Sequence, residues 1–186
     1  MKLRKTALVL AAAAAIAVPT GLNAAPAFAS SPPICSTNGV YSNSCLNRAG
    51  GGTGAGTHII AWYNNGDPNN DFVYIPLSTY CGVGQVSTIC PFRNQSYDQR
   101  YFGDRIYELA APNVSGNKCV AADSTWVNAI LNNCGSNGYV FVRSALGYLV
   151  NVGATNNTGN IMWMYTNTIG NQDHFSTFAD TTWTGP

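Results

Sequence analysis

A ten-residue spacing between an aromatic residue and a phenylalanine occurs twice in this chain. Trp62 precedes Phe72 by ten residues near the start, and Tyr165 precedes Phe175 by ten residues near the end. In both segments the aromatic follows a glycine by six residues, and a polar turn rich in amide and carboxylate side chains comes before the phenylalanine. Recurrence of this kind is typical of repeat architectures, in which one small unit is copied several times.

The first 29 residues have the pattern of a secretory signal peptide. A basic start is followed by an apolar, alanine-rich stretch over residues 7–18, and Ala27-Phe28-Ala29 supplies a small-x-small cleavage site. The apolar stretch is shorter than the roughly 20 residues that span a bilayer. We therefore expect a secreted, extracellular protein with one domain over residues 30–186. The style of the leader is typical of Gram-positive bacteria.

The charge of the predicted mature chain excludes several classes of partner. Three of the nine basic residues lie in the leader, so six basic residues face eight acidic ones, for a net charge of −2. Such a chain has no electrostatic footprint for nucleic acid or for an anionic membrane surface. Asn, Ser, Thr and Gly must carry most of the surface polarity.

All six cysteines lie in the predicted mature part, which is typical of disulfides in a secreted protein. Fifteen connectivities are possible in principle. The spacings favour three local pairs in chain order, Cys35–Cys45, Cys81–Cys90 and Cys119–Cys134. The chain contains no Cys-x-x-Cys motif, so we expect neither a zinc site nor any cofactor.

The pattern after the leader predicts an all-β fold. Apolar residues rarely recur at helical spacing, and Gly, Pro or Asn interrupts the chain about every ten residues. Eleven or twelve short strands at this spacing indicate a sandwich, a barrel or a trefoil. We expect strands near residues 40–47, 57–63, 71–77, 86–92, 100–110, 118–122, 128–133, 139–145, 148–152, 161–165 and 174–178.

The units resemble those of the ricin-type β-trefoil lectins. The segment Gly116-Asn117-Lys118-Cys119-Val120 is similar to the Gly-x-Cys-Leu start of a family unit, and degraded forms of the family's Gln-x-Trp end at Phe72, Phe141 and Phe175. The resemblance covers most of residues 36–178. It implies a β-trefoil-like lectin domain and a disulfide between Cys119 and Cys134. Four partial units are visible where a trefoil needs three, so the stretch at 78–106 is either an insertion or an added strand.

The resemblance also implies two sugar pockets. The family uses an acidic residue at the end of the first strand, an aromatic at the end of the second, and an amide pair in the next turn. These positions hold Asn47, Trp62, Asn69 and Asn70 in the first unit, and Asn151, Tyr165, Gln172 and Asp173 in the last. The middle unit has Ala121 and Leu131 there, and we expect no pocket in it.

The chemistry of these side chains is suited to sugars. A pyranose packs its C–H face on an aromatic ring, and amides both donate to and accept from its hydroxyl groups. Asn47 and Asn151 replace the family's aspartate by a weaker, neutral acceptor. The sequence therefore predicts a secreted carbohydrate-binding protein, with carbohydrate as its partner and galactose-type specificity in question.

Other functions have less support. The two histidines, His58 and His174, fit structural roles, and no nucleophile motif stands in a suitable context, so we expect no enzymatic activity. The main alternative is a secreted protein-binding module or inhibitor, with Trp126, Trp183 and the segment 93–105 as its contact surface. An accessory or targeting subunit of a larger complex is a further alternative.

Overall fold

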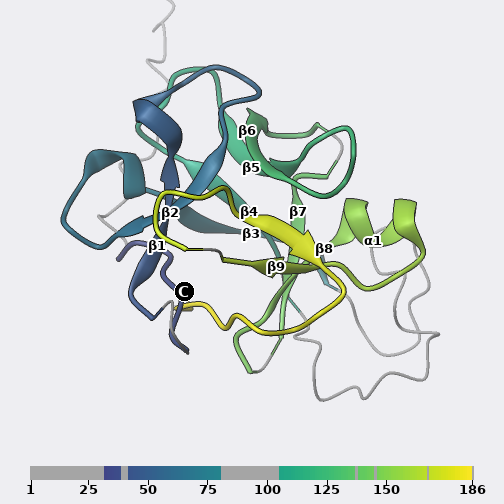
Figure 1. The fold of residues 1–186 in the computed structure, drawn as a ribbon. Helices are drawn as coiled ribbons and strands as arrows, with labels where there is room; N and C mark the ends of the chain where they lie inside the picture. The colour runs from purple at the N-terminus through teal and green to yellow at the C-terminus, as the bar shows by residue number, and fades with distance from the viewer. Residues whose placement is uncertain are drawn as a thin grey trace, which may run out of the picture.

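The computed structural model describes residues 32–38, 42–80, 105–136, 138–144, 146–166 and 168–185. The predicted signal peptide and the predicted Cys81–Cys90 pair lie outside these residues. The described chain is mostly β, as predicted, and its strands pair antiparallel (Figure 1). Its strands are β1 (Ser44–Arg48), β2 (Ile59–Tyr63), β3 (Val73–Tyr80), β4 (Arg105–Ala111), β5 (Lys118–Ala122), β6 (Ala129–Asn133), β7 (Val140–Arg143), β8 (Leu149–Asn151), β9 (Trp163–Tyr165) and β10 (His174–Ser176).

Three short helical segments join these strands. They are η2 (Ala49–Gly51), η3 (Pro68–Asn70) and α1 (Val152–Thr158). The sequence pattern did not predict α1, which consists mainly of poor helix formers. Caps compensate for this: the Asn151 side chain accepts from the backbone N–H of Ala154 at 2.8 Å, and Gly159 ends the helix with a φ of 72°.

Three antiparallel hairpins pair in matching ways. They are β1–β2, β5–β6 and β9–β10, and a buried residue of the first strand faces a buried residue of the second in each. β2 and β6 also share one alternation of buried and more exposed positions, since alternate residues of a strand point to opposite faces. The facing buried pairs are Leu46–Ala61, Val120–Leu131 and Met164–Phe175.

The three hairpins contact one another through single bridges that form a closed triangle. His58 bridges Ile130, Ile60 bridges Gln172, and Asn128 bridges His174. Backbone hydrogen bonds reinforce all three sides: Leu131 donates to Thr57 at 2.7 Å, Asp173 donates to Ile59 at 2.9 Å, and Ala129 donates to Asp173 at 3.0 Å. Each hairpin therefore meets both of the others.

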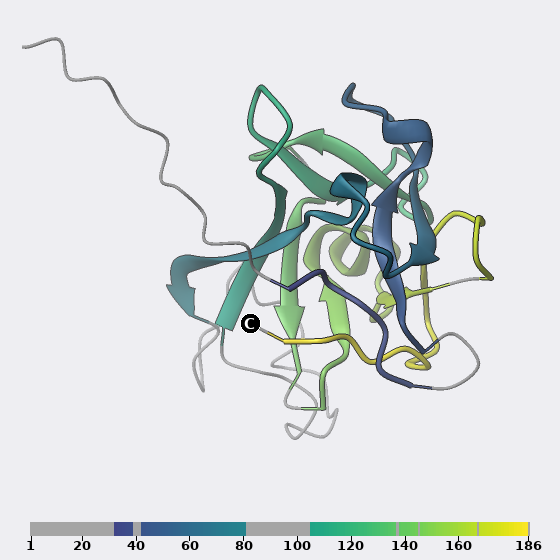
Figure 2. The same cartoon turned by 90° about the vertical axis from the view of Figure 1, so that its left-hand side faces the viewer.

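The remaining strands connect the hairpins. β3 pairs with β4, β4 with β7, and β7 with β8. A bridge from Ser36 to Trp183 brings the two ends of the described chain side by side (Figure 2), and a bridge from Tyr148 to Thr182 pairs the C-terminal segment with the residue before β8. Because β3 and β4 are direct partners, residues 81–104 connect two neighbouring strands.

The core contains Phe72, Phe141 and Phe175, the residues that end the degraded Gln-x-Trp segments. Trp183 joins them, with 1% of its surface exposed and its indole N–H donating to the backbone oxygen of Met164 at 3.3 Å. The expectation that Trp183 forms an exposed contact surface is therefore wrong. Its ring is too large and too deeply packed in the core to serve a partner.

Both predicted disulfides within the described residues are confirmed. Cys35 pairs with Cys45, and Cys119 pairs with Cys134. Each disulfide links two adjacent segments. Cys35 and Cys45 also form a backbone bridge, and Cys119 lies on β5 while Cys134 directly follows its partner strand β6. The covalent links therefore reinforce local pairings of strands.

Candidate functional site

The structure brings together the three amides predicted for the first pocket. The Asn47 side chain on β1 donates to the Asn70 side chain, and Asn69 lies beside Asn70 in η3. Asn47 and Asn70 are buried, whereas Asn69 is half-buried. Asn47 and Asn70 therefore use hydrogen-bonding capacity within the protein, and of the three amides only Asn69 is partly exposed to solvent.

Asp67 adds a carboxylate that the sequence analysis did not single out. One of its oxygens lies 3.4 Å from the Asn47 side-chain nitrogen, and the other accepts from the backbone N–H of Asn69 at 2.9 Å. The second contact caps η3, whose first residue is Pro68. An aspartate followed by a proline is a known signal for the start of a helical turn, so the sequence contained a clue to this role.

Arg48 holds the turn at η3 in place through hydrogen bonds. Its guanidinium donates to the Asn69 side-chain oxygen at 2.9 Å and to the backbone oxygen of Gly52 at 3.1 Å. Burial lowers the pKa of Arg48, while the carboxylates of Asp67 and Asp71 act in the opposite direction. One buried cation therefore links the glycine-rich loop after β1 to the amide-bearing turn.

The exposed aromatic beside this group is Tyr63. Its side chain is 60% exposed, and its backbone oxygen accepts from the Asn70 side chain at 2.8 Å. The predicted stacking residue, Trp62, is half-buried and lies near Gly170, where an added Cβ would be 3.8 Å from the indole. The two rings meet edge to face with centroids 6.0 Å apart. We call Asn47, Tyr63, Asp67, Asn69 and Asn70 the η3 cluster.

The residues predicted for the last pocket make separate structural contacts instead of forming one group. Asn151 is fully buried, caps α1 and donates to the backbone oxygen of Gly138 at 2.6 Å. Tyr165 packs against His174, with ring centroids 4.7 Å apart. The Gln172 side chain donates to the backbone of Ala129 at 3.0 Å.

Burial also limits what the last group can offer to a ligand. Asp173 has 0% of its surface exposed, as does Asn151, so neither side chain presents a surface to a sugar in this conformation. Tyr165 also differs from Trp62 in its place: it lies on the first strand of its hairpin, whereas Trp62 lies on the second. The two ten-residue spacings therefore begin at positions that are not equivalent in the strand pairing.

The middle hairpin has no comparable group of polar side chains at its predicted positions. Ala121 and Leu131 are both fully buried. Trp126, with a φ of 64°, packs close to Gly138 and Gly153, where added Cβ atoms would lie 3.1 and 3.0 Å from its ring. Trp126 is half-buried rather than freely exposed.

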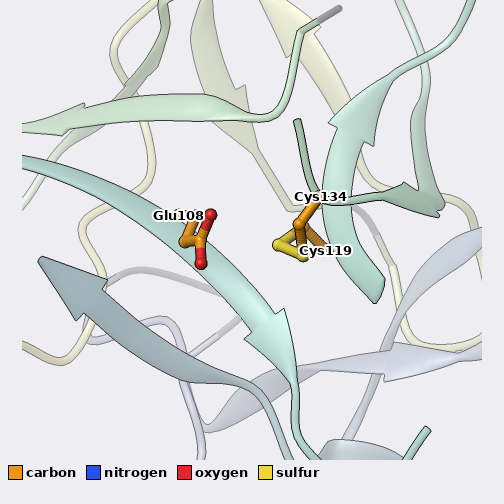
Figure 3. A group of neighbouring side chains, drawn as sticks. All are labelled: Glu108, Cys119 and Cys134. Carbon is orange, nitrogen blue, oxygen red and sulfur yellow. A yellow bond between two sulfur atoms is a disulfide. The ribbon is translucent and has the colours of Figure 1, made fainter. Parts of the chain in front are cut away.

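One group of potential metal ligands occurs in the described part of the chain. The ligand atoms of Glu108, Cys119 and Cys134 lie within 4.8 Å of one another (Figure 3). Metal binding requires thiolates, and both sulfurs are committed to the disulfide. Burial raises the pKa of Glu108, which reduces its ability to act as an anionic ligand. The oxidised group is therefore unsuited to a metal ion.

The alternative function, protein binding, loses part of its predicted contact surface in the structure. Trp183 belongs to the core and Trp126 is half-buried, while residues 93–104 of the third proposed part lie outside the described residues. Larger exposed apolar side chains elsewhere are Val127, Leu146 and Phe178.

Comparison with known proteins gives no family for this chain. No protein-family model, curated protein or solved structure matches it. Among the described residues, no helix has the length and apolar character needed to cross a membrane.

Proposed function

We propose that this chain is a secreted, non-catalytic carbohydrate-binding protein with a β-trefoil-like fold. Three hairpins paired in corresponding register, and the closed triangle that they form, support a threefold arrangement. The resemblance to ricin-type lectins points the same way. Two disulfides are in keeping with folding in an oxidising, extracellular compartment.

This proposal revises the boundaries of the last unit. Corresponding hairpins are β1–β2, β5–β6 and β9–β10, so the segment that follows the last hairpin contains Trp183, which forms an isolated bridge with Ser36. The third aromatic of the repeat is then Trp183, which is buried as Phe72 and Phe141 are. The three units begin near Ile34, Leu109 and Leu149, and residues 81–104 are an insertion between the first unit and the second.

The η3 cluster is the proposed sugar site, and one observation carries it. A carboxylate, Asp67, lies beside the Asn47 amide, and the Asn70 side chain in the same group donates to the backbone of Tyr63, whose own side chain is exposed. This combination offers a charged acceptor, amide donors and an apolar face, which together match the hydroxyl groups and the C–H face of a sugar. Asp67 thereby supplies from the turn the acidic group that Asn47 lacks on the strand.

A glycan array with the wild-type protein tests this function directly. We expect binding of at least one uncharged glycan class, and loss of that binding in Tyr63→Ala. Phe178→Ala is the matched control, because Phe178 is an even more exposed ring, at 70%, outside the cluster. An array without any bound glycan at high protein concentration would refute the proposed function.

A further inference from the structure

The triangle of hairpins has an outward face made of six side chains. Strand alternation points Ile59, Ala129 and Asp173 into the core, so the residues on either side of each point outward. His58 is exposed, and the other five are half-buried. The outward residues are His58, Ile60, Asn128, Ile130, Gln172 and His174.

This face adjoins the η3 cluster on one side only. Asn47 pairs with Ile60 across β1 and β2, and Ile60 bridges Gln172. The three residues therefore form one row across three neighbouring segments, with the η3 cluster at its Asn47 end. Two strand spacings of about 4.8 Å give the row a length of roughly 10 Å, which exceeds the width of a single pyranose ring.

The chemistry of the row is suited to an uncharged chain. None of the six outward residues is Lys, Arg, Asp or Glu, so the face offers no attraction for a charged polymer. Ile60 provides apolar contact area, and Gln172 provides its amide oxygen as an acceptor, since its nitrogen donates to Ala129. Trp62 follows Ile60 by two residues on the same side of β2. An apolar surface edged by an amide matches the alternating C–H and hydroxyl surfaces of a polysaccharide.

We propose that an uncharged polysaccharide chain, entering at the η3 cluster, continues over Ile60 to Gln172. This inference rests on the proposed function and specifies its ligand as a chain of several sugar residues. The η3 cluster holds one residue of the chain, and the Ile60–Gln172 row holds the next ones.

Titration calorimetry with two homologous series tests the path. The probes are xylose to xylohexaose and galactose to β-1,4-galactotetraose. For the series that binds, we expect the affinity to rise at least tenfold from the monosaccharide to the tetrasaccharide. The double variant Ile60→Thr/Gln172→Ala should lose this rise and keep the affinity for the monosaccharide within twofold.

Ile130→Thr is the matched control. Ile130 is an outward, half-buried isoleucine on β6, but it bridges His58 rather than Gln172. We expect this variant to retain the full rise with chain length. Equal affinity for monosaccharide and tetrasaccharide in the wild type would overturn the chain path and leave the proposed function standing, as would an equal loss in Ile130→Thr. Binding of neither series would overturn the chain path, whereas the proposed function fails only if the glycan array also shows no bound glycan.

Discussion

A side-chain nitrogen of Asn47 lies 3.4 Å from a carboxylate oxygen of Asp67, which comes twenty residues later in the chain. Asn47 is on a strand and Asp67 is at the start of a turn, so the fold itself creates this pair. It places a negative charge where the strand has only a neutral amide.

Removal of that charge should weaken sugar binding without loosening the turn. In Asp67→Asn the new side chain can still cap Asn69, because asparagine is as good an N-cap as aspartate. We expect about a tenfold loss of affinity, or ~1.4 kcal/mol, with little change in melting temperature, since a charge-assisted hydrogen bond becomes a neutral one. Glycan titration and thermal unfolding measure the two quantities. Asp71→Asn, at an exposed aspartate that bonds with Asn113, should bind normally; unchanged affinity in Asp67→Asn would exclude a charged acceptor.

Trp183 should contribute strongly to stability. Trp183→Ala leaves a cavity among Phe72, Phe141 and their neighbours, and we expect a loss of about 3–5 kcal/mol in the free energy of unfolding. Trp183→Phe should cost less, because it keeps most of the apolar volume and loses mainly the hydrogen bond to Met164. Urea denaturation followed by far-ultraviolet circular dichroism measures both. A neutral Trp183→Ala variant would contradict a core role.

His174 should make stability depend on pH. Burial lowers the pKa of His174 although the backbone of Gln172 opposes this, so the folded protein favours the neutral ring more than the unfolded chain does. The associated stability is present above the unfolded pKa of about 6.5 and is lost as the pH falls through that value toward the folded pKa. We expect His174→Gln to show a smaller drop in melting temperature than wild type between about pH 8 and pH 5. His58→Gln, at the exposed histidine of the same face, should retain the wild-type drop.

Gly153 should not tolerate a side chain. A Cβ at this position would lie 2.6 Å from the Cα of Gly138 and 3.0 Å from the Trp126 ring, so α1 would have to move. We expect Gly153→Ala to cost about 1–3 kcal/mol, despite the higher helix propensity of alanine. Gly54→Ala is the control, because its Cβ would meet nothing within 4 Å, and chemical denaturation should place it within about 0.5 kcal/mol of wild type. Equal stability of the two variants would mean that α1 shifts freely.

The class of fold could be predicted because it depends on local patterns. Short β-rich runs between Gly, Pro or Asn interruptions indicated the strands β2 and β6, and short cysteine spacings indicated the pairs Cys35–Cys45 and Cys119–Cys134. The amides of the first predicted pocket lie together, since Asn69 and Asn70 are in the turn after β2 and its partner β1 carries Asn47.

The correspondence between the three hairpins could not be predicted from spacing. The three hairpins have connections of different length: ten residues after Arg48, six after Ala122 and eight after Tyr165. Residues at the same distance in sequence therefore occupy different strands of their hairpins: Trp62 lies on the second strand and Tyr165 on the first. Trp183 was misplaced for a different reason: its polar neighbours in the sequence indicated an exposed position, whereas the residue belongs to the core.

The site was predicted only in part, because its geometry depends on the turn. The resemblance indicated which positions matter on the strands, but it gave no role to Asp67 or Tyr63. Both residues become relevant through η3, which folds back over β1 when Asp67 caps Asn69 and Arg48 binds the Asn69 side chain. Such contacts between a turn and a strand leave no periodic trace in a sequence.

The bridge between Ser36 and Trp183 has a consequence for engineering. Because the two ends of the described chain lie side by side, a short linker could join them, and new ends could be opened elsewhere. The connection between β3 and β4 is the natural place, since a cut there leaves each of the three hairpins in one piece. A circular permutant of this kind would carry its new ends between β3 and β4, and would present the three hairpins in a different order along the chain without altering their pairing.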